Sequence, residues 1–167
     1  MEDGSYRLFY FLGSFVTPPD PNQKTHPIYS AVSTDGINFT VEKKVFEEAD
    51  ITDPSVVKLS DGAWLMAVAH SNETILARSS DGMAFTRQEP PISVQGIPEL
   101  GLMADGSVRL YLTRSLHSTD GGKTWTQEPE HFIPRADPSL LAVPGDGYVM
   151  FYKTFPPPRR STRTPVK

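Results

Sequence analysis

The sequence of 167 residues contains no cysteine and no long apolar run, and each absence excludes a class of protein. Without cysteine, the chain has no disulfide, no thiolate metal site and no cysteine nucleophile. No segment approaches the roughly 20 apolar residues that a membrane helix needs. The first four residues also lack the basic start of a signal peptide. We therefore expect a soluble protein with no membrane partner, and the sequence leaves its location open.

Uninterrupted stretches that could form long helices are also missing. The chain has 16 prolines and 12 glycines, and its longest proline-free interval, residues 55–89, contains Asp-Gly pairs at 61–62 and 81–82. Proline removes a helical hydrogen-bond donor, and glycine destabilises a helix interior. The composition therefore excludes a fold built from long helices, and the length suits one domain with a sizeable core.

Charge is distributed unevenly along the chain. The net charge is −4, and residues 155–167 contain four basic and no acidic residues, so the rest of the chain carries −8. An acidic body argues against nucleic acid as a partner. We expect residues 1–155 to form the folded domain and residues 156–167 to be a proline-rich, basic, disordered tail.

Two turn motifs alternate along the chain. Asp-Gly pairs at 3–4, 61–62, 105–106 and 146–147 each precede a short apolar run, which is typical of β-hairpins. A Ser-x-Asp-Gly motif stands at 33–40, 79–86 and 118–126. From its aspartate to the next Asp-Gly pair the distance is 26, 24 and 26 residues. This period predicts a repeat of four short antiparallel strands, A to D, which is typical of a β-propeller blade.

These motifs resemble those of known families. Residues 118–125, STDGGKTW, resemble the Asp box of the sialidase superfamily, and the other two copies have Phe39 and Phe85 in place of tryptophan. The segments TDPSVVKLSDGAWLM (52–66) and ADPSLLAVPGDGYVMFY (136–152) resemble inner-strand repeats of five-bladed glycosidases of families 32 and 43. The resemblance extends to about Lys153 and implies a glycosidase-like propeller. We interpret the Asp boxes as structural, with Ser and Asp binding their own turn and the aromatic ring packing between sheets.

The repeat is incomplete at both ends. The first copy lacks strand A and the last has only A and B, which predicts sheets of three, four, four and two strands. Three interpretations stay open: the last strand A completes the first blade, two chains close a six-bladed ring, or the chain is a piece of a longer glycosidase-like protein. We expect a homo-oligomer, a dimer, because open sheet edges invite pairing.

Three carboxylates are expected at one face of the propeller. Hairpin geometry places the starts of strands A on one face, called the upper face here, and strand A is the innermost strand of a blade. Asp53, Glu99 and Asp137 lie at these starts. Aligning the prolines places Ile97 opposite Asp53, but Glu99, two residues further, points to the same side. Glycoside hydrolysis uses paired carboxylates, and family 43 enzymes are known for an Asp, Asp, Glu set, so we predict these three as catalytic.

Basic side chains are expected around the same rim. His70 and Arg114 end strands B, and Arg135 and Lys153 lie nearby, so we predict that these four bind substrate. The histidines lack metal-ligand spacing and the chain has no phosphate loop, so no metal or cofactor is expected. Sialidase activity is not expected, because nothing in the sequence indicates that its arginines converge. The predicted partner is a carbohydrate and the predicted function is glycosidic hydrolysis; the alternatives are a non-catalytic propeller that binds glycan or protein, and an inactive fragment.

Overall fold

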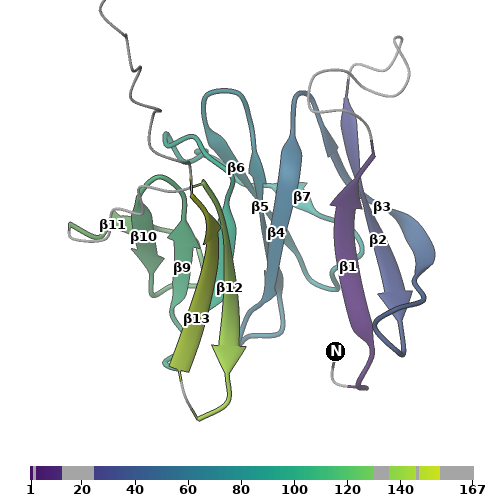
Figure 1. Cartoon of the computed structure of the whole chain (residues 1–167). Helices are drawn as coiled ribbons and strands as arrows, with labels where there is room; N and C mark the ends of the chain where they lie inside the picture. The colour runs from purple at the N-terminus through teal and green to yellow at the C-terminus, as the bar shows by residue number, and fades with distance from the viewer. Residues whose placement is uncertain (2, 13–24, 130–135, 146, 155–167) are drawn as a thin grey trace, which may run out of the picture.

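The computed structural model describes residues 1, 3–12, 25–129, 136–145 and 147–154. Every regular element in these ranges is a β-strand, arranged in four antiparallel sheets (Figure 1). No helix in these ranges could cross a lipid bilayer. The predicted tail at residues 156–167 lies outside the described residues.

The first two sheets contain three and four strands. The first has the order β1 (Tyr6–Phe11), β2 (His26–Ser33), β3 (Thr40–Glu48). The second has the order β4 (Thr52–Lys58), β5 (Trp64–Ala69), β6 (Thr74–Ser79), β7 (Thr86–Arg87).

The last two sheets contain four and two strands. The third has the sequential strands β8 (Glu99–Leu102), β9 (Val108–Tyr111), β10 (Ser115–Ser118), β11 (Thr126–Gln127). The fourth pairs β12 (Ala136–Val143) with β13 (Gly147–Lys153). The predicted all-β propeller fold, with four-stranded blades that are incomplete at both ends, is confirmed.

Short side chains close the turns between the strands. In the third Asp box, Asp120 Oδ1 accepts the backbone N–H groups of Lys123 (3.0 Å) and Thr124 (2.9 Å), and Ser118 Oγ accepts that of Gly122 (2.8 Å). The boxes that contain Asp35 and Asp81 are closed in the same way. These side chains therefore satisfy their own turns, which is the structural role that we expected of the Asp boxes.

The apolar core lies between neighbouring sheets. Phe85 of the second Asp box is buried, and its ring centroid lies 5.9 Å from that of Phe9 on β1. Trp125 packs against the cluster between the second and third sheets. Phe39 of the first box is 39% exposed, so packing between sheets is not found there. The reason is that none of the described sheets lies before the first one.

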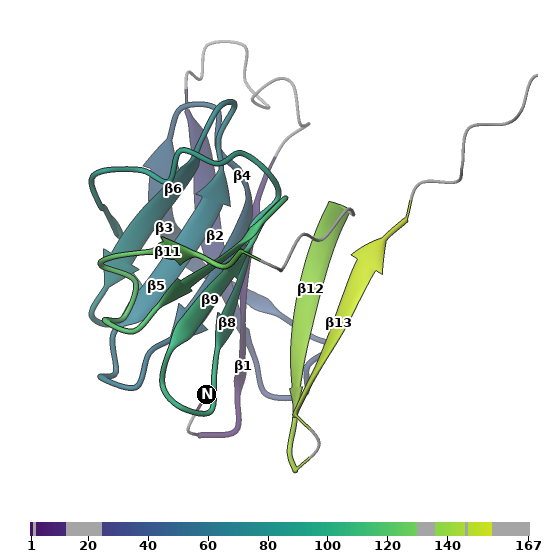
Figure 2. The same cartoon turned by 90° about the vertical axis from the view of Figure 1, so that its left-hand side faces the viewer.

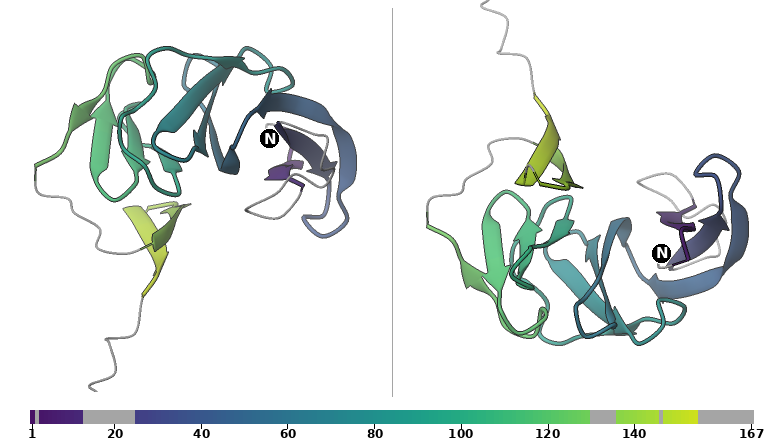
Figure 3. Two further views of the ribbon diagram at one scale, coloured as in Figure 1. Left: turned by 90° about the horizontal axis from the view of Figure 1, so that it is seen from above. Right: turned by 90° about the horizontal axis from the view of Figure 1, so that it is seen from below.

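The four sheets form an open arc around a common axis (Figure 3). Strands β1, β4, β8 and β12 are innermost, and each contacts the next. Seen from the side, the β12–β13 hairpin stands at one end of the arc (Figure 2). Strand β1 matches strand B in the sequence repeat, yet it takes the innermost place because no strand A precedes it among the described residues.

Candidate functional site

Two of the predicted carboxylates sit on an unusual backbone. Asp53 and Asp137 have φ values of 50° and 55°, and each precedes a proline. At both places the strand pairing shifts register, between Thr52 and Ser55 and between Ala136 and Ser139. Left-handed backbone in residues other than glycine is strained, and such strain concentrates at functional sites. Both aspartates therefore share one local structure at the starts of β4 and β12.

Glu99, at the start of β8, is held by two hydrogen bonds. The hydroxyl of Ser55 donates to its Oε2 (2.9 Å), and the backbone N–H of Leu140 donates to its Oε1 (2.7 Å). Burial raises the pKa of this carboxyl, although both bonds act in the opposite direction. A half-buried acid with a raised pKa is a group that can hold a proton near neutral pH.

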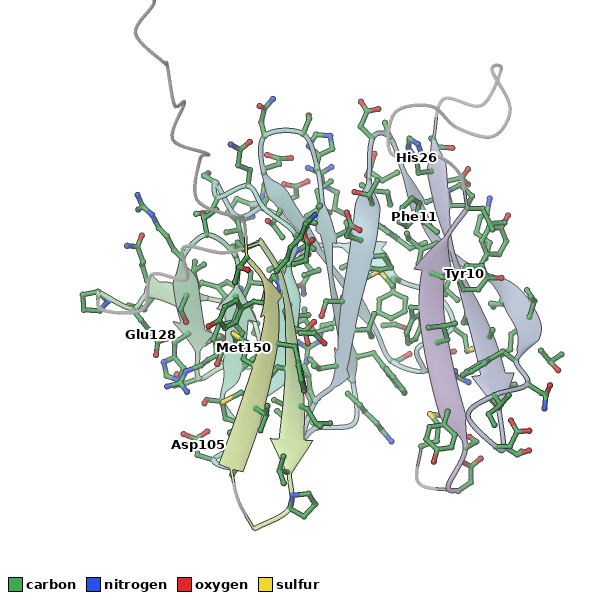
Figure 4. All side chains as sticks on the ribbon, in the orientation of Figure 1. Tyr10, Phe11, His26, Asp105, Glu128 and Met150 are labelled. Carbon is green, nitrogen blue, oxygen red and sulfur yellow. The ribbon has the colours of Figure 1, made fainter. Side chains whose placement is uncertain are left out.

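Two clefts, an upper and a lower one, lie along the axis of the arc. The upper cleft has a volume of about 360 Å³ and is lined by Asp53, Glu99, Pro138 and residues 9–11 of β1. Figure 4 labels two of these β1 side chains, Tyr10 and Phe11, on the upper part of the strand. The lower cleft, of about 380 Å³, is lined by Arg7, Glu99 and Tyr148, among others. Glu99 therefore lies where both clefts meet.

The third predicted carboxylate lies beside the upper cleft. Asp137 is half-exposed and does not line either cleft, but its neighbour Pro138 does. Lys153 Nζ lies 3.6 Å from Asp137 Oδ2 across the β12–β13 pair. The structure thus places Asp53 and Glu99 on one cleft, with the Asp137–Lys153 ion pair next to it.

His70 and Arg114 lie away from the axis. His70 Nδ1 is 3.7 Å from Glu73 Oε1, in the turn between β5 and β6. Arg114 Nη1 donates to Gln127 Oε1 (3.0 Å) on β11, the outermost strand of its sheet. Neither residue lines the two axial clefts. Arg135, the fourth predicted substrate-binding residue, lies outside the described residues.

Groups for other chemistries do not converge in the described part of the chain. Arg78 donates to the carbonyl of Gly121 (2.7 Å) and to Asp61 (2.8 Å), so it joins two sheets at the lower face. Arg114 has a separate partner, as described above. Over the described ranges, no group of three or more His, Cys, Asp or Glu side chains could hold a metal ion.

Two parts of the site were not predicted from the sequence. Ser55 was not selected, although it hydrogen-bonds Glu99 from the neighbouring sheet. The β1 aromatic residues Phe9, Tyr10 and Phe11 were assigned to a strand B, but they line the upper cleft. The missing strand A before β1 was a usable signal for this second part, because a sheet without strand A presents strand B to the axis.

Comparison with known proteins shows a structural likeness only. No protein-family model matches the chain, and no curated protein matches its sequence. A GH43 β-1,3-galactosidase matches at TM-score 0.64 and 14% identity, over 89% of this chain and 38% of that one. A fructofuranosidase from Schwanniomyces occidentalis, in complex with fructosylnystose, matches at TM-score 0.66 and 15% identity, over 90% and 38%.

This chain covers a larger share of a third solved structure. An α-L-arabinofuranosidase from Clostridium thermocellum matches at TM-score 0.58 and 16% identity, over 90% of this chain and 64% of that one. This chain therefore spans between about two fifths and two thirds of these enzymes. At such identity the likeness shows the fold, which is that of a glycosidase-like propeller, in part.

Proposed function

We propose that this chain is a carbohydrate-active, glycoside hydrolase-like propeller whose ligand binds in the upper axial cleft. The observation that carries the proposal is that Asp53 and Glu99 line one cleft beside Asp137, and that both aspartates share the same strained backbone. Phe9 and Phe11, which share one face of β1 on the opposite wall, would offer apolar surface to a sugar ring, whereas Tyr10 stacks on Tyr29 at the other face. In this proposal the Asp boxes only support the scaffold.

The chemistry proposed is acid/base hydrolysis of a glycosidic bond. Glu99, whose pKa is raised by burial, suits the proton donor to the leaving-group oxygen. Asp53 would act as the base or nucleophile, and Asp137 would stabilise positive charge that develops on the sugar. Lys153 holds Asp137 in place by their ion pair. His70, Arg114 and Arg135 would contact only the distant parts of a longer substrate.

Hydrolysis of a panel of chromogenic glycosides tests the proposal. We expect cleavage of at least one glycoside by the wild-type chain, and a loss of at least about 100-fold in Asp53→Asn and Asp137→Asn, the scale of a general acid–base contribution. Asp50→Asn is the matched control, because Asp50 is also an aspartate with positive φ (51°) but does not line either cleft. Equal activity in all four proteins would contradict the assignment.

A second candidate function is glycan binding without hydrolysis. It is favoured by the two hydrogen bonds to Glu99, because both oxygens of this carboxyl already accept a bond. Binding on a glycan array that Asp53→Asn weakens, with no glycoside cleaved, would support this candidate over the enzyme. If neither cleavage nor binding is found, the third hypothesis, an inactive fragment, is favoured.

We also propose that a second copy of the chain covers the open ends of the arc. Large apolar side chains are exposed on both end sheets, among them Tyr6, Phe39, Val41, Val149 and Phe151. Exposed apolar patches on a sheet face commonly mark an interface. The resulting dimer would enclose the axial clefts from the open side.

A further inference from the structure

The inner strands begin with a common three-residue pattern. Residues 53–55 are Asp-Pro-Ser, residues 97–99 are Ile-Pro-Glu and residues 137–139 are Asp-Pro-Ser. In this register Glu99 is equivalent to Ser55 and Ser139, whereas the strained aspartates are equivalent to Ile97. Glu99 therefore occupies a different structural position from the other two carboxylates.

Side chains at this third position connect one inner strand to the next. Ser55 Oγ on β4 accepts the backbone N–H of Leu100 on β8 (2.9 Å). Glu99 Oε1 on β8 accepts the backbone N–H of Leu140 on β12 (2.7 Å). Leu100 and Leu140 are themselves equivalent, each one residue after the third position. The same bond is thus made twice, one blade further along the arc.

A third bond joins these two into a chain. Ser55 Oγ, which accepts from Leu100, donates its own hydrogen to Glu99 Oε2 (2.9 Å). The hydrogen bonds then run from the Leu100 amide through Ser55 and Glu99 to the Leu140 amide. This chain of bonds spans three successive inner strands.

These bonds satisfy backbone groups that the sheets leave unpaired. Among the described strands, β8 pairs only with β9, and β12 only with β13, so the N–H groups of both strands that face the axis have no partner in a described sheet. Leu100 is buried, and an unpaired buried N–H group is costly. The two strands also approach closely, because a Cβ added at Gly101 would lie 2.4 Å from Leu140 Cδ2.

We infer that Glu99, besides being the proton donor proposed above, is a positioning residue: its hydrogen bonds hold β8 against β12, a link called the bracket below, and so fix Asp137 relative to Asp53. The bracket is inferred from the hydrogen bonds alone. The importance of the bracket for Asp137 rests on the proposed function. Leu140 lies three residues after Asp137, at the end of the same strained corner, so the Glu99 bond sets where that corner sits. The role needs two acceptor or donor atoms at residue 99 and does not need a proton to leave it.

Hydrogen exchange at single amides tests the bracket directly. Exchange of the Leu140 and Leu100 amides would be followed by NMR in wild type, Glu99→Gln, Glu99→Ala and Ser55→Ala. We expect Leu140 exchange about tenfold faster in Glu99→Ala, the effect of losing one bond to a charged group. In Glu99→Gln the amide oxygen still accepts from Leu140, so exchange stays within about threefold of wild type.

Ser55→Ala provides the second arm of the test. It removes the acceptor of the Leu100 amide, so Leu100 exchange accelerates while Leu140, still bound to Glu99, remains protected. Unchanged Leu140 exchange in Glu99→Ala, or equal loss in Glu99→Gln and Glu99→Ala, would overturn the inference. If Glu99→Ala does not fold, Glu99→Leu replaces it, because leucine fills a similar volume and has no oxygen that could accept from Leu140.

Ligand binding separates this inference from the proposed function. We expect Glu99→Ala to bind glycan about tenfold more weakly than Glu99→Gln does, because only Glu99→Ala removes the hold on Asp137. Rescue by the conservative variant distinguishes positioning from proton donation, which glutamine cannot perform. The exchange result decides the bracket whether or not a glycan ligand is found.

Discussion

The Asp-box aspartates show how single residues respond to pH. Asp120 accepts bonds from the side chain of Thr124 and from backbone N–H groups, and these bonds hold the pKa of Asp120 well below its usual value. A carboxylate with a lowered folded-state pKa adds stability above its unfolded pKa and loses that stability as pH falls through the folded value. The stability that the Asp boxes contribute to the fold should therefore decrease as the pH falls into the acid range.

We predict that Asp120→Asn lowers the thermal midpoint at pH 7 by a few degrees and makes the midpoint less sensitive to pH below about 4. The reason is that asparagine has one acceptor oxygen instead of two and does not titrate. Circular dichroism melts between pH 7 and pH 2.5 measure both effects. Asp50→Asn, outside the Asp boxes, serves as the control; an identical pH profile for Asp120→Asn and wild type would contradict the prediction.

Glu99 should behave in the opposite way. Burial raises the pKa of Glu99, so the native state holds the proton more tightly than the unfolded chain does. The stabilising contribution is present below the usual value of 4.5 and is lost as pH rises through the folded-state pKa. We predict that Glu99→Gln, which mimics the neutral acid, gains stability relative to wild type as pH rises from 4 to 7. Urea unfolding at several pH values measures this difference, and a constant difference would contradict it.

At the scale of the elements, the Asp boxes connect neighbouring sheets. Phe85 is buried against β1, whereas Phe39, at the equivalent place in the first box, is exposed. We predict that Phe85→Ala lowers the free energy of unfolding by about 3 to 5 kcal/mol, as core phenylalanine truncations do. Phe39→Ala in the monomeric chain should cost under about 1 kcal/mol. Denaturant unfolding measures both losses of unfolding free energy. Equal losses would contradict the prediction, because they would mean that the two boxes are packed alike.

Elements were more predictable from the sequence than contacts between them. The alternation of the two turn motifs predicted sheets of three, four, four and two strands because each turn type is encoded locally. The Ser55–Glu99 bond was not predictable, since it depends on the register between strands 44 residues apart in different sheets. His70 and Arg114 were expected around the rim of the upper face, opposite the carboxylates, but they pair with Glu73 in the β5–β6 turn and with Gln127 on β11.

At the scale of the whole molecule, the open arc predicts association. We expect analytical ultracentrifugation to give the mass of two chains, and Phe39→Glu to shift the chain to a monomer because it places a charge on the exposed end sheet. Arg114→Glu, which also changes charge on an exposed residue but in the third sheet, is the control. A monomer mass for the wild-type chain at micromolar concentration would contradict the proposed dimer.

The upper axial cleft is where we propose that a carbohydrate binds. A crystal structure of the chain with a bound oligosaccharide, chosen from the glycan array, tests this proposal most directly. We expect sugar density between Asp53 and the β1 residues Phe9 and Phe11, within hydrogen-bond distance of the Asp53 carboxylate. Sugar density only on the outer rim, with the cleft filled by water, would contradict it.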